Sequence, residues 1–182
     1  MRLLARRFGV FRLPINYGVN MRERGFSLIE LLVVVAIILI IAAIAIPSFL
    51  HSRMAANESS AVYSIRTINT AQVTYATTYP TVGYASALNM LAAPTSGGEI
   101  TSSNAGILDW VLGCLSQPCE KSGYSFAIVP GTASPDGSLN SYSVWGKPTS
   151  VGITGFRGFC SDNMNPVQYD PTGGINCTQP LQ

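Results

Sequence analysis

The longest uniform feature of the chain is an apolar run at residues 31–50, LLVVVAIILIIAAIAIPSFL. Within it only Pro47 and Ser48 are not apolar, and none of its residues is charged. Twenty helical residues rise about 30 Å, which matches the hydrocarbon core of a bilayer. The length and the lack of charge favour a membrane-spanning helix over a buried core helix, and the run is too long and too branched for the apolar part of a signal peptide.

Beyond this run the apolar positions recur at steps of three or four residues, which is the helical period. The positions concerned are Ala61, Val62, Ile65, Ile68, Gln72, Tyr75, Ala76 and Tyr79. The spacing predicts one continuous helix over residues 26–78, hydrophobic all round in its first half and amphipathic in its second. We expect it to stop at Tyr79-Pro80, because a residue that precedes proline avoids the helical region.

The chain after residue 79 is rich in turn formers, since it holds most of the 17 glycines and 11 prolines. Alternating apolar residues predict strands at 123–129, 141–146 and 155–160, and short helices are expected at 85–91 and 105–113. The turn PDG at 135–137 favours an antiparallel meander. A few short strands cannot cover both of their faces, so we expect them to pack on the amphipathic half of the helix in an α+β fold.

Charge is scarce and unevenly placed. Charged residues make up 11% of the chain and hydrophobic residues 47%, with a mean hydropathy of +0.29, which excludes a disordered tail protein and a nucleic-acid-coating protein. More than half of the 11 basic residues precede the apolar run, whereas the residues after the run are net acidic. By the positive-inside rule, the N-terminus is expected in the cytoplasm and the residues from about 51 onward outside.

All four cysteines, Cys114, Cys119, Cys160 and Cys177, fall on the predicted outer side, where disulfides form. Four cysteines allow three connectivities. We favour the sequence-local pairs Cys114–Cys119 and Cys160–Cys177, because each closes a short loop that contains turn-forming residues. A zinc site is disfavoured, since the chain has no C-x-x-C pair and its single histidine, His51, is far from the cysteines.

The apolar run follows the hexapeptide GFSLIE at residues 25–30, which arginines precede. This motif in this setting resembles the class III signal of type IV prepilins and pseudopilins, with strong resemblance over residues 21–50. The resemblance implies the pilin fold, a long α-helix packed on a small antiparallel β-sheet. The expected division is a leader at 1–25 that is removed, a transmembrane and filament-core half-helix at 26–50, an amphipathic half at 51–79, a connecting loop at 80–122, and a sheet with a disulfide-bounded C-terminal region at 123–182.

The resemblance also implies a fate for the bond between Gly25 and Phe26. A prepilin peptidase would cut it on the cytoplasmic side and methylate the new amine of Phe26. A start at Met21 would give a five-residue leader of the short kind that is common in the family, and a start at Met1 would give a long one. Both alternatives stay open at the level of the sequence.

Two further residues of the helix acquire roles by the same resemblance. Glu30 is a carboxylate near the end of a spanning helix, where it is costly without a partner. In the family this acid pairs with the terminal amine of an adjacent subunit and sets the register of assembly; the alternative is an interfacial glutamate that reaches water. Pro47 removes one helical hydrogen bond. In the family the helix before this proline can melt in the fibre, and a simple kink is the alternative.

The expected function is therefore a structural subunit of a type IV pilus, which polymerises from the inner membrane into a filament for adhesion, motility or DNA uptake. The implied partners are further copies of the chain, prepilin peptidase, an inner-membrane assembly platform with a motor ATPase, lipid before assembly, and minor pilins. No catalytic residues, cofactor or metal are expected. The alternatives are a minor pilin or type II secretion pseudopilin, and an anchored binding module that never polymerises. The region bounded by Cys160 and Cys177 is a candidate contact surface or a plain staple.

Overall fold

A computed structural model describes residues 25–95 and 97–181. The expected leader up to residue 24 lies outside the described residues, so its removal remains a prediction. The chain divides into two compact units, one that ends at Ile41 and one that runs from Ala42 to Gln182.

A helix of 51 residues, α1 (Leu28–Thr78), belongs to both units. Ser27 is its N-cap, since the Ser27 carbonyl accepts the first helical hydrogen bond from the Leu31 amide at 3.3 Å. The helix ends immediately before Tyr79-Pro80, as the sequence predicts. An 18-residue window of α1 has a mean hydropathy of 3.3, and none of that window is buried, so α1 is apolar and long enough to cross a membrane.

In the first unit, the large apolar side chains of α1 are exposed on all sides of the helix. Their exposed fractions run from 47% at Val35 to 81% at Leu28. Such continuous apolar exposure on every side is typical of a helix covered by lipid or by other helices.

In the second unit, one face of α1 is buried and the other is exposed. The buried positions recur at helical spacing: Met54, Glu58, Ala61, Ser64, Ile65, Ile68, Ala71, Gln72 and Tyr75. The exposed and half-buried positions include hydroxyl residues whose side chains donate to the carbonyl four residues back at 2.8–3.0 Å: Ser59, Thr67, Thr70, Thr74 and Thr78. These hydroxyls are therefore hydrogen-bonded within the helix itself.

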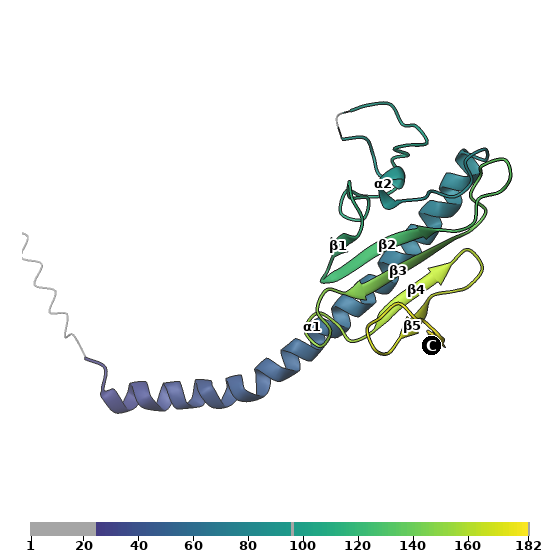
Figure 1. Ribbon diagram of the computed structural model, residues 1–182. Helices are drawn as coiled ribbons and strands as arrows, with labels where there is room; N and C mark the ends of the chain where they lie inside the picture. The colour runs from purple at the N-terminus through teal and green to yellow at the C-terminus, as the bar shows by residue number, and fades with distance from the viewer. Residues whose placement is uncertain (1–24, 96, 182) are drawn as a thin grey trace, which may run out of the picture. The chain divides into compact units, whose positions relative to one another are not determined.

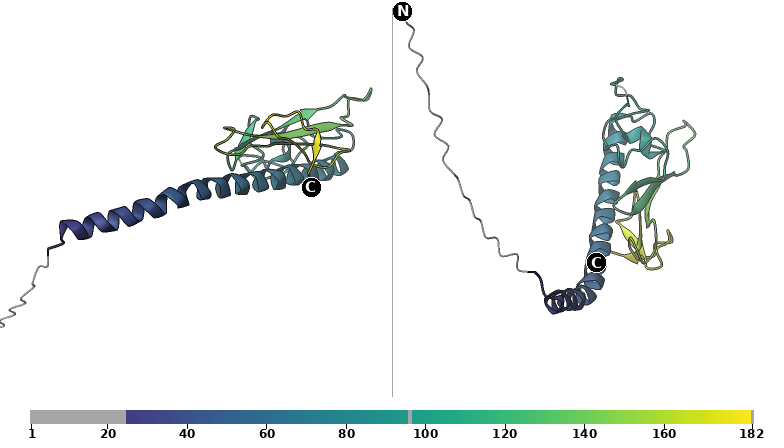
Figure 2. Two further views of the ribbon diagram at one scale, coloured as in Figure 1. Left: turned by 90° about the horizontal axis from the view of Figure 1, so that it is seen from below. Right: turned by 90° about the vertical axis from the view of Figure 1, so that its left-hand side faces the viewer.

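The described residues form one six-stranded antiparallel meander in the order β1-β2-β3-β4-β5-β6. Its strands are β1 (Cys119–Lys121), β2 (Tyr124–Pro130), β3 (Tyr142–Pro148), β4 (Gly158–Asp162), β5 (Gln168–Asp170) and β6 (Gln179–Pro180). Figures 1 and 2 show this sheet as a layer along one side of α1 within the second unit. The predicted α+β fold, a long helix on a small antiparallel sheet, is confirmed.

The core lies between this sheet and the buried face of α1. Ile65 of the helix, Phe126 of β2, Val144 of β3 and Phe159 of β4 have no exposed surface. β3 alternates strictly between buried and half-buried or exposed positions, as a strand with one covered face does. Gly146 of β3 lies against the Phe126 ring, where a Cβ atom would approach to 2.6 Å.

The structure corrects three predicted elements. Residues 105–113 are not helical, because the backbone amides of Ala105 and Leu108 donate to the carbonyls of Met90 and Leu91. The short helix predicted at 85–91 is reduced to α2 (Leu88–Leu91). The strand predicted at 155–160 begins only at Gly158, since a helix side chain takes the amides of residues 156 and 157, as described below.

Candidate processing and assembly site

The bond that joins Gly25 to Phe26 lies before the helix and is exposed. Residues 25–27 have no regular secondary structure, and Phe26 is 82% exposed. No atom outside the immediate chain neighbours lies within 4 Å of the position that a Cβ atom would take at Gly25. A peptidase that binds an extended segment therefore meets an open backbone at this bond.

Glu30 occupies the third position of α1 and caps the helix start. Its Oε2 atom accepts a hydrogen bond from the backbone amide of Ser27 at 2.9 Å. This is one half of a capping box, in which a serine at the N-cap and an acid three residues later satisfy free amides. The negative charge in the first turn also suits the helix dipole. The S-x-x-E spacing is the signal that could have predicted this cap.

Glu30 also lines a shallow, open groove on the first unit. The other residues of this groove are apolar: Phe26, Ile29, Val33 and Val34. The start of α1 thus presents a carboxylate beside an apolar surface, which is the arrangement that a neighbouring helix with one positive group would complement.

Pro47 lies inside α1, which continues through it. Because proline has no amide proton, it cannot donate to the carbonyl of Ala43 four residues back. The structure thus places Pro47 in an intact helix, and melting before it stays a prediction.

A polar link that sequence analysis missed joins α1 to the connection between β3 and β4. Glu58 is 8% exposed, and its Oε1 atom accepts from the backbone amides of Phe156 at 2.9 Å and Arg157 at 3.2 Å. Its Oε2 atom accepts from Arg157 Nε at 2.8 Å and lies 2.7 Å from Nη2. The Arg157 guanidinium also lies over the rings of Phe159 and Tyr169. This set of bonds fixes the β3–β4 connection to the helix.

The pKa of Glu58 reflects these contacts. Burial alone would raise it, but the hydrogen bonds from the amide of Phe156 and from Arg157 outweigh burial, so the pKa lies below its ordinary value of 4.5. Glu58 is thus held as a carboxylate near neutral pH.

Two other helix side chains hold the loops and strands by hydrogen bonds. The buried Gln72 amide accepts from the backbone amide of Ala85 and donates to its carbonyl, at 2.8 and 2.9 Å. Asn69 donates to Ser161 Oγ at 2.8 Å and accepts from Tyr142 Oη at 3.0 Å. The face of α1 that meets the sheet is therefore partly polar, and its polar groups are paired.

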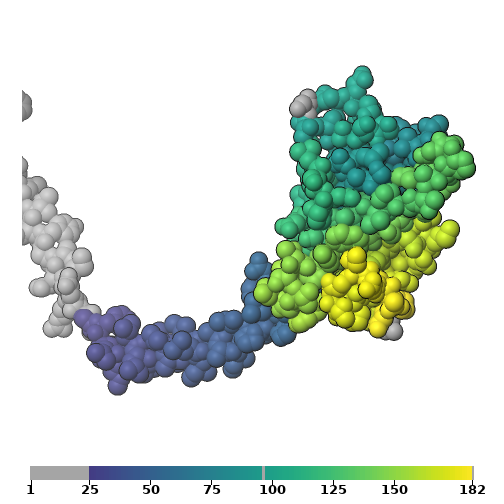
Figure 3. Space-filling model, viewed as in Figure 1, coloured from purple at the N-terminus to yellow at the C-terminus, as the bar shows by residue number. Residues whose placement is uncertain are grey.

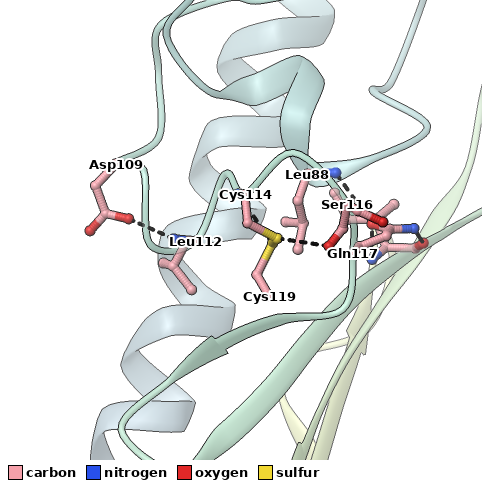
Figure 4. The surroundings of a disulfide bond; sticks show 8 residues. Leu88, Asp109, Leu112, Cys114, Ser116, Gln117 and Cys119 are labelled. Atoms are coloured by element: carbon pink, nitrogen blue, oxygen red, sulfur yellow. Dashed lines mark hydrogen bonds between the residues drawn. A yellow bond between two sulfur atoms is a disulfide. The ribbon is translucent and has the colours of Figure 1, made fainter. Parts of the chain in front are cut away.

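Cys114 and Cys119 form a disulfide with a Cα–Cα distance of 5.6 Å (Figure 4). Inside the loop that it closes, Gln117 Oε1 accepts from the backbone amides of Leu88 and Ile128, and Nε2 donates to the Ile128 carbonyl at 2.8 Å. The small loop thus connects α2 with β2, and the disulfide closes it next to β1.

Cys160 and Cys177 form the second disulfide, with a Cα–Cα distance of 5.9 Å. Between them Asp170, which is 5% exposed, accepts from the amides of Thr172 at 2.9 Å and Asn176 at 3.1 Å. Hydrogen bonds from the Thr172 hydroxyl and amide hold the pKa of Asp170 below its usual range. Both disulfides follow the sequence-local pairing. Among the residues described, no three histidine, cysteine or acidic side chains gather as a metal site would require.

Comparisons with known proteins agree with this architecture at the N-terminal end. The family described as the prokaryotic N-terminal methylation motif matches residues 20–46. Over 56 residues the chain is 48% identical to the type IV major pilin protein PilA of Myxococcus xanthus (strain DK1622). That match covers 31% of this chain and 26% of that protein, so the chain spans about a quarter of the relative's length. No solved structure matches significantly. In its N-terminal part the chain is therefore similar to type IV pilins, and its described residues have a pilin-like fold, a long helix on an antiparallel sheet.

Proposed function

We propose that the chain is the structural subunit of a type IV pilus filament. The observation that carries the proposal is the all-round exposure of the apolar side chains at the start of α1, from Val35 at 47% to Leu28 at 81%. Burying apolar surface is favourable by about 25 cal/mol per Å², so we do not expect this part of the helix to stay exposed to water. Lipid and neighbouring helices are the two environments that can cover it.

Assembly would move this helix from the first environment to the second. The precursor spans the inner membrane with its N-terminus in the cytoplasm, and prepilin peptidase cuts before Phe26 and methylates its amine. Lipid and packed helices solvate apolar side chains almost equally well, so the exchange is close to balanced. A separate motor ATPase at an assembly platform drives extraction, and minor pilins join the same filament.

Glu30 would align the subunits during this step. An apolar helix has no preferred offset along an apolar neighbour, whereas an opposite-charge pair in a low dielectric fixes one. The free amine of a processed Phe26 on an adjacent subunit is the positive group that fits the carboxylate and groove at residues 26–34.

The second candidate, a type II secretion pseudopilin, is less well supported. Acidic residues are scarce near the C-terminus, since only Asp162 and Asp170 fall in the last 25 residues. Both carboxylates already accept hydrogen bonds from their own loops, Asp162 from the amides of Met164 and Asn165. An acid-rich calcium loop of the kind typical of major secretion pseudopilins is therefore not supported by these residues.

The test is electron microscopy of material sheared from cells, with mass spectrometry of its N-terminal peptide. We expect long fibres made mainly of this chain, with an N-terminal N-methylated Phe26. Methylated chain confined to the envelope would favour a minor pilin or pseudopilin instead. A chain that keeps its arginine-rich leader and forms no fibre would overturn the proposal.

A further inference from the structure

The connection between β3 and β4, residues 149–157, carries large apolar side chains on its outside. Val151, Ile153 and Phe156 are exposed by 54%, 73% and 47%. The backbone of this β3–β4 loop is nevertheless well fixed, because the amides of Ile153 and Thr154 both donate to the Ser150 carbonyl, at 3.2 and 2.9 Å. A hydrogen-bonded loop that exposes apolar residues is typical of a contact surface rather than of a flexible connection.

Hydrogen bonds place this loop beside α1, close to where the apolar run ends. Asn57 Nδ2 donates to the Thr154 carbonyl at 2.9 Å, and Glu58 binds the amides of residues 156 and 157. Ile153 lines a groove together with Leu50, the last residue of the run, and Arg53. Figure 3 shows the loop, in light green, against this part of the helix.

The distances along the helix match the layers of a membrane. From Leu50 to Asn57 an α-helix rises about 10 Å, which is close to the headgroup layer on one side of a bilayer. A span that ends at Leu50 therefore puts the attachment point of the loop in the headgroup layer and its apolar residues near the boundary with the acyl chains.

The charges of the groove fit a lipid surface as well. Its lining contains one charged side chain, Arg53, and no acid. The nearby Arg157 is already paired with Glu58. A cation beside apolar side chains is the combination that binds anionic lipid interfaces.

We propose that the β3–β4 loop is a membrane-interface contact of the precursor. While the apolar stem, residues 26–50, spans the bilayer, Val151, Ile153 and Phe156 enter the boundary between headgroups and acyl chains, and Arg53 faces the lipid phosphates. The loop thus fixes the height and orientation of the second unit above the membrane before assembly. This inference rests on the proposed function in one respect, the membrane-spanning state of the stem.

Depth-dependent fluorescence quenching tests the contact. The full chain with Ile153→Trp is reconstituted into phosphatidylethanolamine and phosphatidylglycerol vesicles whose acyl chains are brominated near the headgroup. Ile100→Trp is the matched control, since Ile100 is 66% exposed and its loop lies at the opposite end of the second unit in Figure 1. The emission of the two native tryptophans, measured in the unsubstituted chain, is subtracted.

We expect the added emission of Ile153→Trp to fall by about half in brominated vesicles, and that of Ile100→Trp to stay unchanged. Equal quenching of the two variants would overturn the proposal. The proposal would also be overturned if the tryptophan of Ile153→Trp were shielded from solvent only in assembled fibres and not in vesicles. That result would assign the loop to a contact between copies of the chain.

Flotation of the same vesicles separates this inference from the proposed function. A chain that floats with the vesicles but shows no quenching at residue 153 would refute the loop contact and leave the membrane anchor intact. A chain that does not float with them would refute both.

Discussion

At the scale of single residues, Glu30 has two roles that one pair of substitutions can separate. Its carboxylate caps α1 through the Ser27 amide, and we propose that its charge aligns subunits. Glu30→Gln keeps an oxygen that can accept the Ser27 hydrogen bond but removes the charge, whereas Glu30→Ala removes both. We expect both variants to insert and to be cleaved, and neither to give more than about a tenth of the wild-type filament yield, as counted by electron microscopy. Normal filaments from Glu30→Gln would show that the hydrogen bond suffices.

Glu58 makes the stability of the second unit depend on pH. Its pKa is lower in the folded chain than its ordinary value of 4.5, so the carboxylate contributes its full stabilisation above that pH. The contribution is lost as the pH falls through the lower, folded value. Urea unfolding of the detergent-solubilised chain across this acid range should therefore show a fall in unfolding free energy.

Glu58→Gln is the control for this pH dependence. The variant should be less stable by about 2 kcal/mol near neutral pH, because charged hydrogen bonds to Arg157 and two backbone amides are weakened. Its unfolding free energy should fall less steeply with acid than that of the wild type. Parallel acid profiles for the two proteins would mean that other carboxylates carry the effect.

The two acids also differ in how far sequence could predict their contacts. The Glu30 cap is local, and the S-x-x-E spacing alone predicts it. The partners of Glu58 lie 98 and 99 residues away, and no local pattern specifies a contact at that separation. From sequence alone, a charged residue in an amphipathic helix is expected on the solvent-exposed face, whereas Glu58 is buried.

At the scale of elements, Gly146 sets how closely β3 packs on β2 and the helix. A Cβ atom at this position would lie 2.6 Å from the Phe126 ring and 3.4 Å from Ile65. We expect Gly146→Ala to destabilise the chain by about 1–3 kcal/mol, as overpacking does, measured by urea unfolding. Gly98→Ala is the control, since a Cβ atom there meets only ordinary contacts with Pro94. Equal stability of the two variants would show that the Phe126 ring can move enough to accommodate the added methyl group.

The two disulfides should stabilise the chain unequally. The loop closed by Cys160 and Cys177 spans 17 residues, and that closed by Cys114 and Cys119 spans 5. Loop-closure entropy gives about 3 kcal/mol for the first and about 2 kcal/mol for the second. Paired cysteine-to-serine variants, compared by urea unfolding, should keep this order. The reverse order would show that loop-closure entropy does not decide how much each disulfide contributes.

Elements with a long or strict pattern were predictable, and short ones were not. The spacing of Ile65, Ile68 and Tyr75 gives the helix, and the alternation of Tyr142 and Val144 gives β3. β1, β5 and β6 have two or three residues each, too few for a period to appear. These short strands form because neighbouring strands supply their hydrogen-bond partners. Their own sequences do not contain that information.

At the scale of the whole molecule, the orientation of the chain in the membrane remains a proposal with a direct test. Protease added to spheroplasts should digest the residues from 51 onward in the precursor and leave the arginine-rich leader protected. Immunoblots against a leader tag and against the C-terminal residues distinguish the two ends. Digestion of the leader with protection of the C-terminal part would reverse the proposed orientation.

The sequence indicates a polymerising stem only indirectly, because the contacts that would define polymerisation are made with other copies of the chain. The stem residues are apolar and the motif at 25–30 is specific, but the partner of Glu30 belongs to another molecule in the proposal. What the fold adds is the exposure of the apolar side chains of that stem, together with the paired polar groups between helix and sheet in the second unit.

The hydroxyl groups on the free face of α1 have a consequence for crowding. The hydroxyls of Thr67, Thr70 and Thr74 already donate hydrogen bonds to carbonyls of their own helix. A close neighbour could thus cover these three side chains without leaving a hydroxyl proton unpaired, whereas the exposed Arg66 beside them would still need a partner. Lateral contact over this face would therefore cost little at the threonines, and its energy would depend on how Arg66 is paired.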